Sequence, residues 1–267
     1  MNKPRIRKLF RRLSIGFSVV LFAVFLFFLL RPEGEYTVPE NQYRDKEPVF
    51  SLRILSWNVE TSTKGIPWEK RQQSFREVLK EQDFYIICLQ EAEKGQIEFF
   101  SKLYPGHEVY GVGRDDGKSK GEHGPIFFKT GRFRLVKKET FWLSKTPEKP
   151  STGWGELYPR VCSTVELLDI PSGKTFRVFN THLHLHPYAQ IKGAELISSK
   201  IDANRSPTVL VGDMNCPPSW KPIKKFNDLG LTSAESSGAL TFHMFGKPLR
   251  CLDPVASHRT DTSRTDS

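Results

Sequence analysis

The sequence predicts a mixed α/β fold in which two β-sheets pack face to face with helices on the outside. Short, almost fully apolar strands such as "DFYIICLQE" and "PTVLVGDMN" are typical of strands covered on both faces. Amphipathic helices separate several of these strands, and two segments read as antiparallel hairpins. The chain alternates in this way from residue 51 to residue 253.

The N-terminal segment reads as a membrane anchor. Residues 1–12 are basic, and Leu13 to Leu30 is an uncharged apolar run that would span roughly 27 Å as a helix, close to the thickness of the hydrocarbon core. Residues 31–50 are polar and proline-containing, so they read as a linker. The positive-inside rule then predicts a single-pass protein with a cytoplasmic N-terminus and an extracytoplasmic domain.

The first half of the domain is expected to begin with a strand over residues 52–59, followed by a helix over 66–82 with Pro67 in its first turn. A buried strand over 83–91 and a short helix over 95–106 follow. Residues 111–124, "GVGRDDGKSKGEHG", form a polar, glycine-rich loop, in which we expect Asp115, Asp116, Glu122 and His123 to be solvated rather than part of a site.

The second half is expected to open with a strand pair over residues 125–143 that turns at Thr130-Gly131. A hairpin over 160–183, a helix over 188–202, a strand over 207–215 and a helix over 219–230 complete it. The polar residues 254–267 are expected to be an unstructured tail.

Charge favours an anionic partner without identifying it. The net charge is +10, but six of the excess basic residues precede residue 13 and belong with the anchor. Nucleic-acid binding therefore cannot be argued from charge alone. The four cysteines are scattered without a CxxC pair, which argues against a cysteine-ligated zinc site.

Polar residues stand at the carboxyl ends of four predicted strands, where α/β sheets place their ligand sites. Asn58, Glu91, His182 and Asp213 occupy these positions. Glu91 is a hard oxygen ligand suited to Mg²⁺, and Asp213 could take a proton from an attacking water. Asn58 and Asn215 could orient that water or assist the metal shell, while His182 and Arg160 could steady phosphate oxygens.

In order, "LRILSWNVE", "IICLQEAE", "FNTHLHLH" and "VLVGDMNCPP" resemble the endonuclease/exonuclease/phosphatase superfamily from about residue 51 to residue 230. The resemblance implies a four-layer α/β sandwich that hydrolyses phosphoesters with Mg²⁺ or Mn²⁺. It places Glu91 and Asn58 at the metal, His182 and Arg160 at the phosphate, and Asp213 with Asn215 at the water. Nucleic acid, a phospholipid headgroup or an inositol phosphate could each be the substrate, and no obligate protein partner is evident.

The alternation of His182, His184 and His186 also resembles the histidine pattern of a zinc hydrolase. An Asp-His pair should then follow directly, but Pro187 and Tyr188 stand there instead. The phosphoesterase interpretation therefore assigns catalysis to His182 alone.

The C-terminus departs from the superfamily, which normally closes with an "SDH" motif. Here "CLDPVASHRTDTSRTDS" ends the sequence, and Ser257-His258 lacks the expected aspartate. We therefore expect the second sheet to miss its last strands and catalysis to be impaired. A catalytically impaired phosphate- or lipid-binding module on the same fold is thus an alternative function.

Overall fold

A computed structural model describes residues 52–202 and 206–233, together with three short strands at 242–244, 247–250 and 256–258. The expected anchor and linker lie outside these residues. Within the described residues, no helix is long and apolar enough to cross a membrane.

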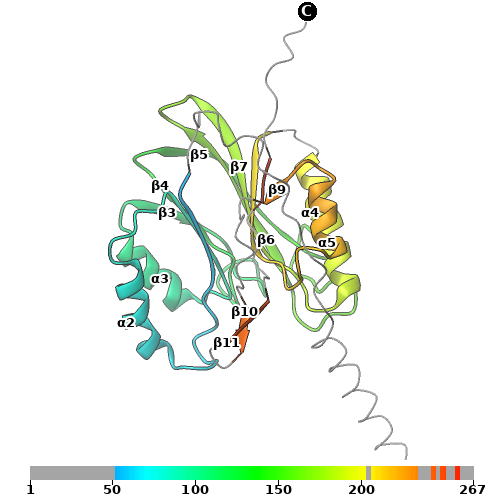
Figure 1. The fold of residues 1–267 in the computed structure, drawn as a ribbon, viewed down its shortest axis with the longest axis horizontal. Coiled ribbons are helices and arrows are strands. Elements are labelled where there is room, and N and C mark those ends of the chain that lie inside the picture. Colours follow the sequence, from blue (N-terminus) through cyan, green and yellow to red (C-terminus); the bar gives the residue numbers. More distant parts are fainter. Residues whose placement is uncertain (1–51, 203–205, 234–241, 245–246, 251–255, 259–267) are drawn as a thin grey trace, which may run out of the picture. The chain divides into compact units, whose positions relative to one another are not determined.

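Two β-sheets lie between two pairs of helices, which makes four layers (Figure 1). The first sheet has the order β1-β2-β4-β3, with α2 and α3 packed on its outer face. Its elements are β1 (Ile54–Asn58), α2 (Trp68–Leu79), β2 (Ile86–Gln90), α3 (Lys94–Leu103), β3 (His107–Tyr110) and β4 (Ile126–Lys129). The predicted sandwich is therefore confirmed.

The second sheet has the order β5-β6-β7-β8-β12-β9, and α4 and α5 cover its outer face. Its first three strands form an antiparallel meander, and β8 then pairs in parallel with β7. Its elements are β5 (Phe133–Trp142), β6 (Val161–Asp169), β7 (Lys174–His182), α4 (Pro187–Asp202), β8 (Thr208–Asp213), α5 (Lys221–Asn227), β9 (Thr232–Ser233) and β12 (Ala256–His258).

The apolar residues Ile86 to Leu89 of strand β2 are explained by the position of the strand between two parts of the core. Because successive side chains point to opposite faces, Ile87 and Leu89 pack under the helices. Ile86 and Cys88 pack instead against the second sheet, beside Val178 of β7. All five residues of β2 are buried, so each face of the strand contributes to a different part of the core.

A polar bridge joins the two sheets inside this core. Asn180 of β7 is fully buried, and its Nδ2 donates to the backbone oxygens of Leu89 at 2.8 Å and Pro125 at 3.0 Å. Gln90 Nε2 donates in turn to Asn180 Oδ1 at 2.7 Å. The bridge fixes the end of β2, which Glu91 follows, relative to β7, which ends at His182.

The expected strand pair at 125–143 is wrong in its pairing. Strand β4 pairs with β2 and β3, whereas β5 pairs with β6. The turn at Thr130-Gly131 therefore carries the chain from one sheet to the other. Local turn signals mark where a strand ends, but they do not say which strand it will pair with.

The end of the chain also differs from expectation. β10 (Phe242–Met244) and β11 (Lys247–Arg250) form a separate two-stranded sheet. Strand β12, which lies in the expected tail, pairs with both β8 and β9. Its His258 lies opposite Thr208 at the start of β8, whereas Asp213 ends that strand.

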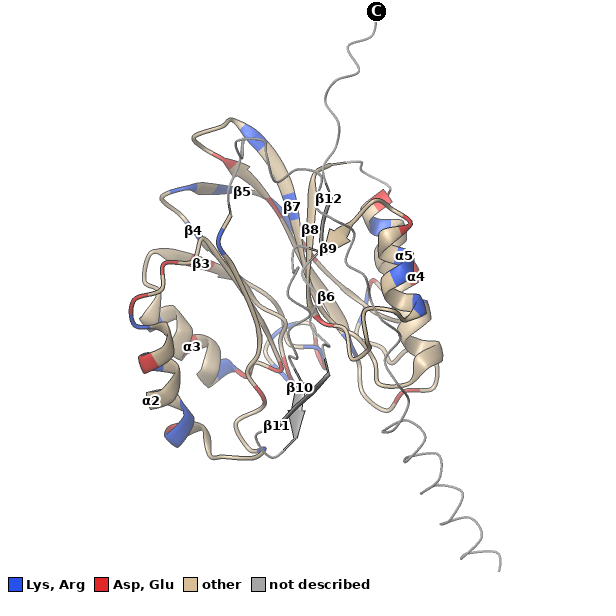
Figure 2. Ribbon diagram, in the orientation of Figure 1, with Lys and Arg blue, Asp and Glu red and all other residues tan. Residues whose placement is uncertain are grey.

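Lysines and arginines share the helices of both outer layers with aspartates and glutamates (Figure 2). The helices in this view therefore present mixed charge rather than a surface of one sign. Three of the four cysteines, Cys88, Cys162 and Cys216, are buried and free, while Cys251 lies outside the described residues.

Candidate active site

The carboxyl ends of β1, β2, β7 and β8 meet, and they bring the predicted site residues together. Asn58 ends β1, and its Nδ2 donates to Glu91 Oε1 at 3.1 Å and to Asp213 Oδ2 at 2.9 Å. Glu91 follows a strand of the first sheet, and Asp213 ends a strand of the second. A single amide therefore links acids that are far apart in sequence and belong to different sheets.

Glu91 is held in its ionised form. Its backbone has a φ of 54°, a left-handed conformation that turns the chain sharply after β2. Burial alone would raise the pKa of Glu91, but hydrogen bonds from Asn58 and from Lys64 Nζ at 2.9 Å outweigh it, so this pKa is lowered. Glu91 thus presents a permanent negative charge to any cation.

The pKa of Asp213 is shifted in the opposite direction to that of Glu91. Burial raises its pKa above the usual value, despite hydrogen bonds from Asn58 and from the backbone nitrogen of Asn215. Two neighbouring carboxyls with pKa values displaced in opposite directions are suited to different roles, one binding a cation and the other accepting a proton. The sequence assigns the metal to Glu91 and the water to Asp213, and these roles stay predictions.

Asn215 lies beside Asp213 and stabilises the turn after β8. Its backbone nitrogen donates to Asp213 Oδ1 at 2.9 Å, and its Nδ2 donates to the backbone oxygen of Leu183 at 2.9 Å. Its φ of 51° is again left-handed, a conformation that asparagine tolerates better than most residues. In this arrangement Asn215 orients Asp213 through the backbone and ties the ends of β7 and β8 together.

His182 is neutral and has a defined tautomer. Burial, followed by the charges of Arg160, Arg114 and Lys64, lowers the pKa of His182 well below its usual value. Arg160 Nη1 lies 2.6 Å from His182 Nδ1. Since a guanidinium can only donate, Nδ1 accepts and the proton sits on Nε2, which faces Asp213 Oδ2 at 3.5 Å.

Arg160 is part of a charged group that the sequence did not reveal. Its Nη1 lies 3.6 Å from Glu122 Oε2, and Arg114 binds the same carboxylate oxygen. The side chain of Glu122 is only 15% exposed, and His123 is buried. The expectation that Glu122 and His123 are solvated is therefore wrong, because this end of the loop folds inward, whereas Asp115 and residues 118–121 are exposed.

The density of glycines in that loop was the sequence feature that could have indicated its folded path. A Cβ on Gly113 would lie 2.3 Å from the backbone oxygen of Lys120, and one on Gly121 would lie 2.4 Å from Asp115 Oδ2. Such close approaches require glycine and indicate a loop that folds back on itself. Lys64, which the sequence also left unassigned, carried no comparable signal.

The histidine pattern divides into three different environments. His182 lies in the site, His184 is buried with its ring 6.1 Å from that of Trp154, and His186 is exposed. Among the described residues, no cluster of three or more His, Cys, Asp or Glu is placed to hold a metal ion. The structure therefore gives no support to a zinc site built from alternate histidines.

We expect His184 to make folding sensitive to acid. Burial lowers the pKa of His184 to about 4. The negative charge of Glu156 opposes this shift, and the positive charge of Arg160 adds to it. The unfolded chain takes up a proton near pH 6.5, so stability falls as pH drops from about 6.5 towards 4. The free energy of unfolding should fall by about 2 kcal/mol between pH 7 and pH 5 from this group.

Urea titrations at both pH values, with His184→Phe and His186→Asn, test this expectation. The His184 variant should lose less stability on acidification than the wild type, whereas the exposed His186 variant should behave like the wild type. Identical pH dependence in all three proteins would contradict it.

The donors around Asn58 fit a magnesium ion better than a zinc ion. They are the carboxylate oxygens of Glu91 and Asp213, and Mg²⁺ is commonly held by one or two carboxylates while water and substrate phosphate complete its shell. The ammonium of Lys64 already lies 2.9 Å from Glu91 Oε2, so a cation is stable at this carboxylate. Glu91 is thus the residue that would hold the ion, whereas Asn58, expected to be a ligand as well, turns its amide nitrogen to the two acids and its oxygen to the backbone of Glu60.

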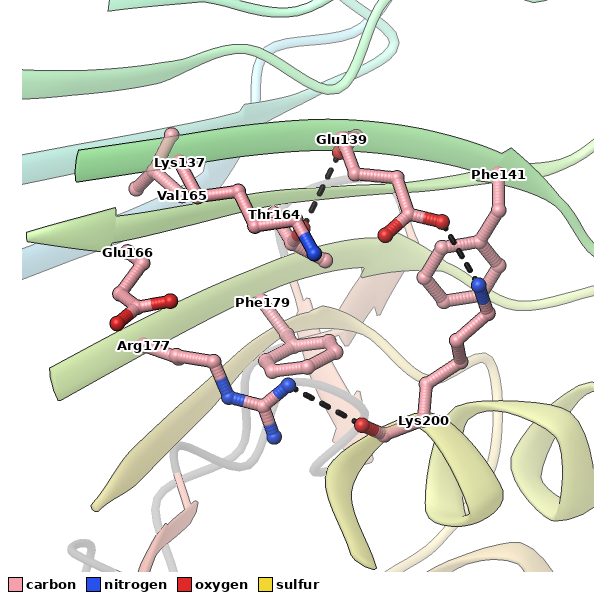
Figure 3. A pocket seen from close by; sticks show the side chains of 9 residues that line it. All are labelled: Lys137, Glu139, Phe141, Thr164, Val165, Glu166, Arg177, Phe179 and Lys200. Carbon is pink, nitrogen blue, oxygen red and sulfur yellow. Dashed lines mark hydrogen bonds and ion pairs between the residues drawn. The ribbon is translucent and has the colours of Figure 1, made fainter. Parts of the chain in front are cut away.

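A groove of about 240 Å³ lies elsewhere, on the outer face of the second sheet beside α4 (Figure 3). Phe141 and Phe179 line it, and Lys200 Nζ binds Glu139 Oε1 at 2.7 Å across it. Arg177 also lines the groove, five residues before His182 on β7, or about 16 Å along an extended strand. The groove is therefore separate from the site around Asn58.

The site combines acids that attract a hard cation with arginines and a histidine that can bind phosphate oxygens, and this chemistry defines a phosphoesterase. Comparison with known proteins agrees. Residues 55–265 match the Endonuclease/Exonuclease/phosphatase family, and the chain belongs to this family.

Two solved structures from Bacteroides thetaiotaomicron are similar along most of the chain. One is an endonuclease/exonuclease/phosphatase family protein with 31% identity and a TM-score of 0.70, covering 77% of this chain and 82% of its own. The other is a mannosyl-6-phosphatase with 30% identity and a TM-score of 0.71, covering 78% and 85%.

A curated relative, the CCR4-Not complex 3'-5'-exoribonuclease subunit Ccr4 of Emericella nidulans, is 28% identical over 182 residues. The match covers 59% of this chain but only 27% of that protein.

Proposed function

We propose that the protein is a Mg²⁺- or Mn²⁺-dependent phosphoester hydrolase. The observation that carries the proposal is the contact of one amide nitrogen, Asn58 Nδ2, with both Glu91 and Asp213. Because these acids come from different sheets, their convergence depends on the complete sandwich. The pairing places a cation-binding group directly beside a proton-accepting group.

Glu91 is proposed to hold the ion, and Asn58 is proposed to position the acids around it. Glu91 contributes a charged oxygen that its hydrogen bonds keep ionised. Asn58 Oδ1 accepts from the backbone nitrogen of Glu60 at 3.0 Å, which fixes its amide nitrogen toward Glu91 and Asp213. A bound Mg²⁺ would polarise the phosphoryl group and stabilise the negative charge that develops on it.

Asp213 and His182 are proposed to act on the attacking water and the phosphate. Asp213 orients that water and takes its proton, which the raised pKa of this carboxyl favours. His182 donates a hydrogen bond from Nε2, and Arg160 adds a fixed positive charge for the phosphate oxygens. Asn215 keeps Asp213 in position through its backbone nitrogen.

We further propose that residues 13–30 anchor this hydrolase in the membrane with the domain outside the cytoplasm, because the run is uncharged and follows a basic N-terminus. The printed names of the relatives include both a phosphatase and an exoribonuclease. Phosphomonoesters and phosphodiesters are therefore both candidate substrates, and they include nucleic acid, phospholipid headgroups and inositol phosphates.

Turnover of p-nitrophenyl phosphate and of its bis ester by the full chain tests the proposal. Activity should require Mg²⁺ or Mn²⁺ and should vanish with a chelator. Glu91→Gln should lower kcat/KM by about 10–100-fold, with partial recovery at high Mg²⁺, because one charged ligand is lost. Glu98→Gln, on the exposed side of α3, is the matched control and should leave the rate unchanged.

Equal, near-zero rates in the wild type and in Glu91→Gln would favour a catalytically impaired phosphate-binding module instead. The register of β12 is the observation that favours this second candidate. It sets His258 opposite Thr208, at the far end of β8 from Asp213.

A further inference from the structure

Lys64 places its ammonium group at the acid to which the metal ion is assigned. Its Nζ donates to Glu91 Oε2 at 2.9 Å, while the other carboxylate oxygen, Oε1, accepts from Asn58. The side chain of Glu91 is only 13% exposed, whereas that of Lys64 is 57% exposed. Lys64 therefore reaches a largely buried carboxylate from the solvent side.

The loop that carries Lys64, residues 59–67 between β1 and α2, is held in place by both helices of the first sheet. The guanidinium of Arg71, on α2, donates to four of its backbone oxygens, those of Val59, Glu60, Thr61 and Ile66. Gln96, on α3, donates to one of the same oxygens at 2.7 Å. The position of the Lys64 backbone is therefore set by the fold and does not depend on the ion pair with Glu91.

Two other acids belong to this loop or contact it. Glu60 Oε2 lies 4.0 Å from Arg71 Nη1, and the Glu93 side chain accepts a backbone N–H of the loop and one of α3. Both carboxylates thus have partners other than Lys64. Lys64 pairs with Glu91 even though the loop offers these two acids, which makes its position at the site specific.

The charge of Lys64 acts on more of the site than Glu91. Burial, followed by the charges of Arg160 and Arg114, lowers the pKa of His182, and the charge of Lys64 adds to this effect. His182 ends a strand of the second sheet, whereas Glu91 follows a strand of the first. The ammonium is therefore close enough to influence residues from both sheets.

Glu91 needs a positive partner even when no metal ion is bound. Asn58 Nδ2 links it to Asp213, so two carboxylates share one amide donor. Two neighbouring carboxylates repel each other when both are ionised. Lys64 offsets this repulsion because it brings a positive charge to Glu91.

The same position puts Lys64 in conflict with a metal ion. Two cations at one carboxylate oxygen repel each other, and the repulsion is strong where water is partly excluded. A divalent ion can bind Glu91 Oε2 only if the ammonium moves away. The exposed side chain of Lys64 can turn into solvent while its loop stays in place.

We propose that Lys64 competes with the divalent ion for Glu91 Oε2, so that binding of the ion requires displacement of this ammonium. Lys64 is then a positioning residue that sets the metal affinity of the site. The inference rests on the proposed function, since it concerns the same ion. It goes beyond that function by assigning a role to a residue outside the motifs that define the site.

Calorimetric binding of Mn²⁺ to the full chain tests the inference without turnover. Lys64→Met keeps the length of the side chain but removes its charge, so it should bind Mn²⁺ about fivefold more tightly than the wild type. This is the upper end of the range for partly exposed ion pairs. Lys64→Arg keeps the charge and should restore the weaker, wild-type affinity. Lys70→Met, exposed in the first turn of α2, is the matched control and should bind like the wild type.

Thermal unfolding supplies a second readout, which a purely structural role of Lys64 would not reproduce. With a chelator, Lys64→Met should unfold about 2–4 °C below the wild type, because Glu91 has lost its positive partner. With saturating Mn²⁺ this difference should disappear, since the ion replaces the missing charge. A residue that only stabilised the loop would lower the transition temperature equally in both conditions.

The possible outcomes separate the inference from the proposed function. Mn²⁺ affinities of the wild type and Lys64→Met that agree within about 1.5-fold, or weaker binding by the variant, would overturn the inference even if Mn²⁺-dependent turnover is normal. Tighter binding by Lys64→Met, without turnover of either phosphate ester by any of the proteins, would refute the hydrolase and support the competition. Absence of Mn²⁺ binding to both proteins would overturn the two together.

Discussion

Replacement of Asp213 by asparagine should lower kcat by about 10²–10⁴-fold while changing KM little, because the site loses the group that accepts the proton of the attacking water. The substitution keeps the shape of the side chain. The backbone nitrogen of Asn215 can still donate to the remaining carbonyl oxygen, but the new amide nitrogen then faces the donor Asn58 Nδ2. We therefore expect a modest loss of stability from the two facing donors, and the large effect in the chemical step.

Steady-state rates with saturating Mg²⁺ measure this effect, and thermal unfolding of the variant should show that the fold is intact. Asp202→Asn, at the exposed end of α4, makes the same chemical change away from the site and should retain wild-type activity. An Asp213→Asn rate within about twofold of the wild type would remove Asp213 from the mechanism.

The Asn180→Asp variant should be destabilised by about 4 kcal/mol, the largest stability effect we expect in this chain. The substitution replaces an amide that donates to two backbone oxygens, at 2.8 and 3.0 Å, with a carboxylate that repels both. The position is fully buried, so water cannot solvate the new charge. Only Gln90 Nε2 would still donate to this side chain.

Urea denaturation and calorimetry test this expectation, and the transition temperature should fall by roughly 10 °C. Acidification should recover part of the loss, because a protonated carboxyl no longer carries the charge. Asn227→Asp, exposed at the end of α5, is the matched control and should stay within about 0.5 kcal/mol of the wild type. Equal stability of the two variants would show that Asn180 does not bridge the sheets.

Much of the site was predictable because its residues lie at the ends of strands. Asn58, Glu91, His182 and Asp213 were found because the carboxyl ends of apolar strands can be read from hydrophobic patterning. Parallel pairing of β1 with β2 and of β7 with β8 then places each pair side by side. Arg160, less tightly defined by its motif, also proved to contact His182.

Glu122, Arg114 and Lys64 could not be found in the same way. They lie in loops, and a loop's path depends on the surface onto which it folds. Arg114 reaches the site because its backbone oxygen accepts from Trp142, which is contributed by a strand of the other sheet. Similarly, the pairing of β5 with β6 rather than with β4 is set by the packing of whole sheets.

The sequence by itself determined most of the helices and strands up to residue 230, the layered class of fold and the strand-end residues, because periodicity, turn residues and residue chemistry are local properties of the chain. The tertiary structure alone decided that one amide should hold Glu91 and Asp213 together and that a glycine-rich loop should carry Arg114 to the site. Those contacts join segments that are distant in sequence, so they form only when both sheets pack against each other.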